Sequence, residues 1–63
     1  MTDTTLTIDG TTYNIVVYLA EDTGGWRAEA ARDGRVVAVI DVVSERDAWA
    51  GIRKVLERRN GAR

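Results

Sequence analysis

The stretch TLTIDGTTYNI, residues 5–15, is typical of a β-hairpin. At its centre stands Asp9-Gly10, and an Asp-Gly pair favours the two-residue type I′ turn because that turn needs positive φ at both positions. With the turn placed there, Leu6 lies opposite Tyr13, so the apolar side chains of both strands point to the same face of the hairpin. The sequence therefore predicts two antiparallel strands joined by a tight turn.

A second Asp-Gly pair, Asp33-Gly34, stands between two further β-rich runs and predicts a second hairpin of the same kind. The two hairpins are connected by the polar run from Glu21 to Gly25, whose paired glycines relieve the steric limits on φ. The chain has no Pro that would interrupt a strand. Four strands are therefore expected, at about residues 4–8, 12–20, 26–31 and 35–43.

From Ser44 onward the apolar residues recur at every third, fourth and seventh position, which is the pattern of an amphipathic helix. Its apolar stripe consists of Ala48, Trp49, Ile52, Val55 and Leu56. Ser44 suits the N-cap and Gly61 a stop, so we expect the helix at about residues 45–59, followed by a short basic tail at 60–63. Gly51 lowers helix stability by about 1 kcal/mol relative to Ala, and close packing on the sheet would explain its presence.

These elements predict a single α+β domain, in which a four-stranded antiparallel meander is followed by one C-terminal helix on one face of the sheet (ββββα). Alternation along the strands assigns the following side chains to the helix face: Leu6, Ile8, Tyr13, Ile15, Val17, Leu19, Trp26, Ala28, Ala30, Val37 and Val39. The opposite face then carries a second apolar set: Val16, Tyr18, Val36, Ala38, Ile40 and Val42.

The second apolar set predicts an interface, because a strand that is apolar on both faces is normally buried on both. A domain of about 60 residues also buries only about 60% of its unfolded surface, which favours oligomerisation where disulfides and metals are absent. A homodimer or a protein partner is therefore expected on this face. The alternative is a monomer that leaves these residues exposed among Arg27 and Glu29.

The composition argues against catalysis. The 63 residues include no Cys and no His, which removes thiol nucleophiles, the commonest general base and the commonest metal ligand. The only Ser is the expected helix cap, and no pair of carboxylates has a spacing that would bring them together. We therefore expect no enzymatic activity, no cofactor and no metal. The absence of a long apolar run or a secretion-signal pattern predicts a cytoplasmic protein without a membrane span.

Charge is distributed unevenly along the chain. Residues 1–45 hold eight acidic and three basic side chains, whereas residues 46–63 hold two acidic and six basic ones. The acidic loop residues Glu21 and Asp22 are candidates for contact with a basic partner protein. Five basic side chains of the helix are candidates for contact with nucleic acid: Arg46, Arg53, Lys54, Arg58 and Arg59. The alternative is that they solvate the helix, with Arg53 paired to Glu57.

Three runs of the sequence resemble HicB-like antitoxins. They are YNIVV at residues 13–17, EDTGGWRA at residues 21–28, and SERDA at residues 44–48, which is followed by Ile52 and Leu56. That family combines a strand, an acidic Gly-rich hairpin ending in an aromatic residue, and a helix opened by Thr or Ser with Ala four residues later. The resemblance covers about residues 13–56.

The resemblance implies a sheet-and-helix module, partially RNase-H-like or similar to a double-stranded RNA-binding domain, that oligomerises and neutralises a small basic toxin. It does not imply catalysis or autonomous operator binding. The run RDGRV at residues 32–36 stands where the family has a Pro- and Gly-containing segment with a Cys.

The sequence as a whole therefore predicts a small, non-enzymatic protein-binding module that inhibits or regulates a partner protein. Two roles fit it equally, that of an antitoxin and that of a phage-encoded inhibitor of a host defence complex such as an anti-CRISPR, and in both a dimer through the sheet is expected. The alternative is a nucleic-acid-binding regulator that uses the basic face of its C-terminal helix.

Overall fold

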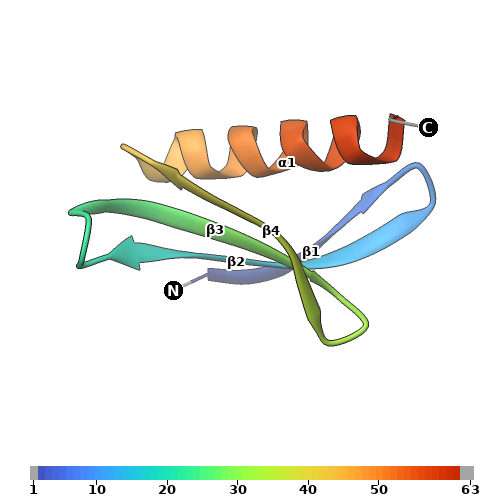
Figure 1. Ribbon diagram of the computed structural model, residues 1–63, viewed down its shortest axis with the longest axis horizontal. Coiled ribbons are helices and arrows are strands. Elements are labelled where there is room, and N and C mark those ends of the chain that lie inside the picture. The colour runs from blue at the N-terminus through green and yellow to red at the C-terminus, as the bar shows by residue number, and fades with distance from the viewer. Residues whose placement is uncertain (1, 62–63) are drawn as a thin grey trace.

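The computed structural model describes residues 2–61 and contains four strands and one helix (Figure 1). Their bounds are β1 Thr2–Ile8, β2 Thr11–Ala20, β3 Gly25–Arg32, β4 Arg35–Val42 and α1 Glu45–Gly61. The strands form one antiparallel sheet in the order β1-β2-β3-β4, and α1 lies along one face of it. The predicted ββββα fold is confirmed.

The helix is longer than the sequence predicted. Residues 60 and 61, which were expected in a basic tail, form its last turn. The rest of that expected tail, residues 62–63, lies outside the described residues. At the other end, the hydroxyl of Ser44 accepts a hydrogen bond from the backbone N–H of Asp47 at 3.2 Å, which confirms Ser44 as the N-cap.

Both Asp-Gly turns have the predicted backbone conformation. Asp9 and Gly10 have φ values of 51° and 81°, and Asp33 and Gly34 have values of 53° and 77°. Positive φ at both central positions is the signature of the type I′ turn, whose twist matches that of the strands it joins. The turn in the first hairpin therefore fixes the predicted register of β1 against β2.

The second hairpin departs from the predicted register at one residue. Ala31 pairs with Val36 as expected, but Ala30 pairs with Ala38 and not with Val37. Val37 is thus an extra residue in β4, and the shift between Ala30 and Ala31 is a β-bulge. Because side chains alternate with a period of two, one extra residue moves every later side chain of β4 to the other face.

The prediction for the second half of β4 is therefore wrong. Ala38, Ile40 and Val42 pack against the core on the helix side instead of forming the opposite face. Val39, which was expected under the helix, pairs with Glu29 on the face that points away from it and is half exposed. The positions predicted for Val16, Tyr18 and Val36 on that second face follow from the observed pairing of the strands.

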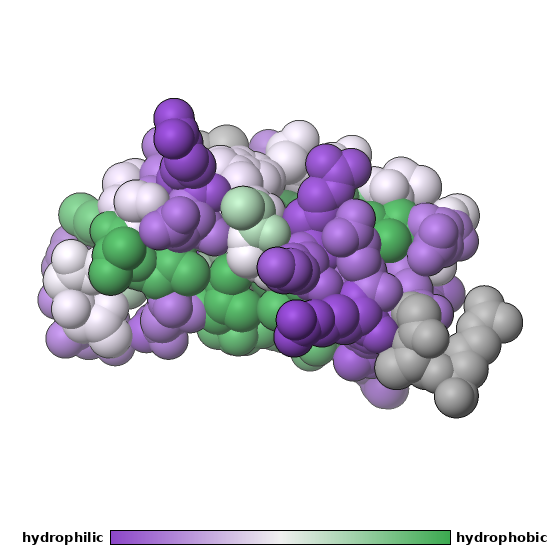
Figure 2. All heavy atoms as spheres, turned by 90° about the horizontal axis from the view of Figure 1, so that it is seen from above, coloured by the Kyte–Doolittle hydropathy of each residue, from purple (hydrophilic) through white to green (hydrophobic). Residues whose placement is uncertain are grey.

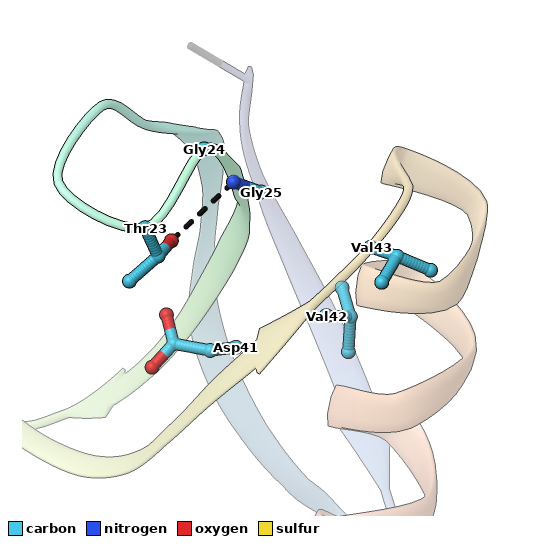
Figure 3. A pocket seen from close by; sticks show the side chains of 6 residues that line it. All are labelled: Thr23, Gly24, Gly25, Asp41, Val42 and Val43. Atoms are coloured by element: carbon cyan, nitrogen blue, oxygen red, sulfur yellow. Dashed lines mark hydrogen bonds between the residues drawn. The ribbon is translucent and has the colours of Figure 1, made fainter.

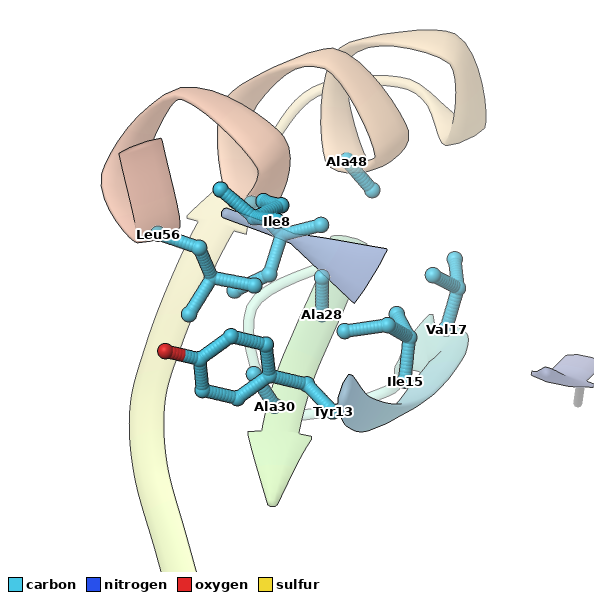
Figure 4. Packing of buried hydrophobic residues seen from close by; sticks show 9 residues of the cluster. Ile8, Tyr13, Ile15, Val17, Ala28, Ala30, Ala48 and Leu56 are labelled. Carbon is cyan, nitrogen blue, oxygen red and sulfur yellow. The ribbon is translucent and has the colours of Figure 1, made fainter. Parts of the chain in front are cut away.

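The core lies between α1 and the sheet (Figure 4). Its buried members are Ile8, Tyr13, Ile15, Val17, Ala28, Ala30, Ala48, Ile52 and Leu56. Leu19, which was predicted to belong to it, is 55% exposed. The helix lies mainly over β3 and β4, so it does not cover this residue near the end of β2.

Two further contacts hold the helix on the sheet. A Cβ atom on Gly51 would lie 2.7 Å from Cδ1 of Ile40, so the helix packs closely on β4 at this position, against a side chain and not against another backbone. At the C-terminal end of α1, the hydroxyl of Tyr13 donates a hydrogen bond of 2.9 Å to Oδ1 of Asn60. The side-chain amide of Asn60 in turn donates one of 3.2 Å to the carbonyl oxygen of Ile8. This link between the helix end and the first hairpin could not be predicted from the sequence.

Candidate interaction surfaces

We call the side of the sheet that faces away from α1 the open face, because no described element covers it. The strand pairing places two rows of side chains across it. One row runs Asp3, Val16, Glu29 and Val39, and the next runs Tyr18, Arg27 and Asp41. Val36 and Ala31 pair with each other on the same face. The open face is therefore mixed, with valines beside Arg27 and Glu29 as the sequence predicts, and it loses Ala38, Ile40 and Val42 to the helix side.

A charge network occupies the centre of the open face. Nε of Arg27 donates a hydrogen bond of 2.6 Å to the carboxylate of Asp41, and its Nη2 lies 3.3 Å from that of Asp22. The hydrogen bond to Asp41, followed by those to Tyr18 and Asp22, raises the pKa of Arg27 above its ordinary value. This guanidinium therefore stays charged and ties the loop before β3 to the edge strand β4.

Tyr18 is bound to the acidic side of the same network. Its hydroxyl donates a short hydrogen bond to the carboxylate of Glu29. That bond is the main reason why the pKa of Tyr18 is raised above 10.0, with partial desolvation adding to it.

Replacing Glu29 by Gln should lower the pKa of Tyr18 toward its ordinary value. Because the folded pKa is raised, the contribution of this bond to stability is complete below pH about 10 and is lost as the pH rises through the folded pKa. NMR titration of ring-labelled tyrosine separates Tyr18 from Tyr13 and measures the shift directly. An identical Tyr18 titration in both proteins would show that Glu29 does not hold the hydroxyl.

The predicted acidic loop residues have different surroundings. Asp22 is bound by Arg27, whereas Glu21 is exposed and has no ion-pair partner within residues 2–61. The loop is closed by backbone N–H groups of Thr23 and Gly24, which donate to the carbonyl oxygen of Ala20 at 3.2 and 2.8 Å. Glu21 is thus the loop carboxylate that remains available to a partner.

An open pocket of about 310 Å³ lies where this loop meets the end of β4 (Figure 3). It is lined by Thr23, Gly24, Gly25, Asp41, Val42 and Val43. Its one carboxylate, that of Asp41, is already bound by Arg27, and the hydroxyl of Thr23 accepts a hydrogen bond from the Gly25 N–H at 3.3 Å. Among the described residues, no group of three acidic, His or Cys side chains could hold a metal ion.

The edge strand β4 is the second candidate surface. None of its eight residues is buried, in contrast to β2, where Tyr13, Ile15 and Val17 are enclosed under the helix. Val36 and Val39 are 57% and 50% exposed, and Val43, which follows the strand, is 85% exposed. Figure 2 looks down on the helix and shows apolar side chains in a band along the side on which Figure 1 places β4. The core is therefore incomplete at this edge.

The basic side chains of α1 do not form one continuous surface. All five candidates are exposed, and Arg53 lies 3.7 Å from Glu57 in the predicted ion pair. Arg46 and Arg53 are seven residues apart on one side of the helix, whereas Lys54 and Arg58, four residues apart, lie on another. Arg59 stands apart from both pairs. Within residues 2–61, α1 is also not long and apolar enough to span a lipid bilayer.

Comparisons with known proteins returned no match: no protein-family model, no curated protein and no solved structure is significantly similar to this chain.

Proposed function

We propose that the protein is a small, non-enzymatic binding module that inhibits or regulates a partner protein through its open face. The observation that carries the proposal is an uncovered sheet surface on which exposed apolar side chains stand among carboxylates. The partly exposed Val16 and the half-exposed Val39 alternate with Asp3 and Glu29 in a single row across the four strands. Interfaces between proteins that also exist apart combine apolar and polar area in this way.

The charge of this face favours a basic partner. Three carboxylates lie on it, those of Asp3, Glu29 and Asp41, and the adjoining loop adds those of Glu21 and Asp22. The two rows that contain the charged side chains of this face include a single basic residue, Arg27. A surface with this excess of carboxylates attracts a cationic protein and speeds its approach. The resemblance to HicB-like antitoxins supports the same direction, since it implies a small basic toxin as the target. A phage-encoded inhibitor of a host defence complex is an equal alternative.

The experiment uses three immobilised proteins and an extract of the source cells. Val16→Lys places a cation at the centre of the open face between Asp3 and Glu29, where the neighbouring carboxylates make it compatible with the fold. The matched control replaces Arg46 and Arg59 by Ser on the helix. We expect a basic protein to be retained by the wild type and the helix variant and lost from Val16→Lys. Equal retention by all three, or loss from the helix variant alone, would contradict the proposal.

Binding to nucleic acid through α1 is the second candidate. It is favoured by the exposed Arg46, Lys54, Arg58 and Arg59, which have no ion-pair partner among the described residues. Phosphate contacts release counterions, so such binding weakens steeply as salt rises. Titrating a short DNA duplex at low and moderate salt tests it with the same helix variant. Salt-sensitive binding that the variant abolishes would favour this candidate over protein binding.

A further inference from the structure

We propose that two copies of the chain associate through their β4 edges, in an antiparallel pair that extends the two sheets into one of eight strands. This interface is separate from the proposed partner-binding function, because it uses the edge of the sheet and not its open face. The first observation is that β4 ends the sheet, so one side of its backbone has no strand beside it within residues 2–61. Unpaired edges of this kind accept another strand unless they are protected.

The two edges of the sheet differ in protection. Residues 36–40 of β4 read VVAVI, a run of high β-propensity without a charged residue or Pro. The run is flanked by Arg35 and by Asp41, which is bound by Arg27. The opposite edge, β1, reads TDTTLTI and exposes mainly Thr and Asp. The edge with the apolar, uncharged central run is the one that association would bury.

The position of the helix fits this arrangement. Gly51 of α1 packs against Ile40 and lies near Val42, so the N-terminal half of the helix borders the edge at which the second copy would pair. The C-terminal end of α1 lies over the first hairpin, where Asn60 binds Tyr13 and Ile8. The second copy thus adds a strand beside β4 and covers the apolar side chains that this edge leaves exposed.

The sequence of β4 is self-complementary about Val39. A two-fold axis at this residue pairs Val39 with its own copy and Ala38 with Ile40 of the other copy. Ala38 and Ile40 are on the helix side, so this register buries apolar against apolar there, while the two Val39 side chains meet on the open face. The two Asp41 carboxylates are then kept away from each other, because each lies two residues from the axis and on opposite sides of it.

The helix flank beside β4 carries charges of opposite sign on either side of Gly51. Gly51 contacts Ile40 and so marks the β4 side of α1, and Asp47 and Lys54 lie four residues before and three residues after it on that side. The midpoint between Asp47 and Lys54 falls next to Gly51. Val55, which is 37% exposed, is on the same flank.

The length of β4 is sufficient for a continuous ladder between two copies. Its eight residues span about 27 Å at about 3.4 Å each, and pairing along this length would add backbone hydrogen bonds to the burial of the exposed Val36 and Val39.

The first test is the mass in solution. Sedimentation of the wild type should give a mass twice the 7.0 kDa of the chain. The Val39→Lys protein should sediment as a monomer, because the substitution places two cations opposite each other at the centre of the β4 pair. Val39 is half exposed, so the variant retains its fold, which circular dichroism checks. The matched control is Thr5→Lys on the opposite edge β1, which should remain dimeric. A wild type that sediments as a monomer, or a Val39→Lys protein that stays dimeric, would refute the proposal.

The second test distinguishes the edge from the face. The chain has no Cys, so a single introduced thiol reports its own neighbours. Val39→Cys should form an intermolecular disulfide on mild oxidation, since the two residues meet at the proposed axis. Val16→Cys, at the centre of the open face, should not. Cross-linking through Val16→Cys would show that the copies join face to face and would overturn the edge arrangement.

These outcomes are independent of the proposed function. Retention of a partner by Val16→Lys tests the open face, whereas the mass of Val39→Lys is measured without any partner protein and so tests the association of two copies. If the edge pairing is correct, the open faces of the two copies form one continuous surface.

Discussion

Replacing Ile52 by Ala should lower the free energy of unfolding by about 2–5 kcal/mol. Ile52 is fully buried and lies in the middle of α1, between the helix and the sheet. Its truncation removes apolar contacts and leaves a cavity, because neighbouring side chains relax only in part. A domain of 63 residues is expected to be stable by only about 3–9 kcal/mol in total. The substitution therefore removes a large share of the stability of the fold.

Urea unfolding at one fixed protein concentration measures this effect, because association also contributes to stability. Ile52→Val is the graded control, since it deletes a single methylene and should lower the stability by about 0.5–1.5 kcal/mol. An Ile52→Ala protein as stable as the wild type would mean that α1 does not close the core.

Replacing Gly25 by Ala should have the second largest effect, a loss of about 1–3 kcal/mol. The new Cβ would lie 2.5 Å from the carbonyl oxygen of Val42. The carbonyl oxygen belongs to the backbone and Cβ is bonded directly to it, so no side-chain rotation can relieve the clash. The strands β3 and β4 must therefore separate at this end. Gly25 does not have positive φ, so the effect comes from the close approach of two strands and not from backbone conformation.

The matched control is Gly51→Ala. Its Cβ would meet Cδ1 of Ile40 at 2.7 Å, but this atom is the free end of a side chain that can turn aside. The helix also gains about 1 kcal/mol when Ala replaces Gly. Thermal unfolding should therefore show little change for Gly51→Ala and a Tm lowered by about 4–8 °C per kcal/mol for Gly25→Ala. The reverse order of the two variants would contradict the packing described for both glycines.

The sequence predicts those parts of the fold that depend on local rules. An Asp-Gly pair between β-rich runs specifies a tight turn, and both such turns form as expected at Asp9 and Asp33. The helix follows in the same way from its apolar period and its cap at Ser44. These signals lie within a few residues of the structure that they specify.

The β-bulge could not be predicted, because the run of valines in β4 fits either face of the sheet. Val36, Val37 and Val39 have the same propensity and polarity, so alternation alone does not show which residue is extra. The strand pairing supplies the reason. Without the bulge Arg27 would face Ile40, whereas with it Arg27 faces Asp41 and forms an ion pair.

The same limit applies to the candidate surfaces. The acidic character of the loop was visible in the sequence, but the binding of Asp22 by Arg27 depends on how the loop folds back. The contact of Asn60 with Tyr13 and Ile8 joins residues 47 and 52 positions apart. No periodicity or turn signal spans such a distance, so contacts of this kind are accessible only from the three-dimensional arrangement.

The meander order of the strands has a consequence for the route by which the chain folds. Each strand pairs with the one that precedes it, so every step of sheet formation closes a short loop and loses little chain entropy. The contact between Asn60 and Ile8 is different, because it joins the two ends of the molecule. The entropy cost of closing this contact is small once the hairpins have formed, because they have already brought those ends together. A chain of this topology is therefore suited to rapid, sequential assembly from local units.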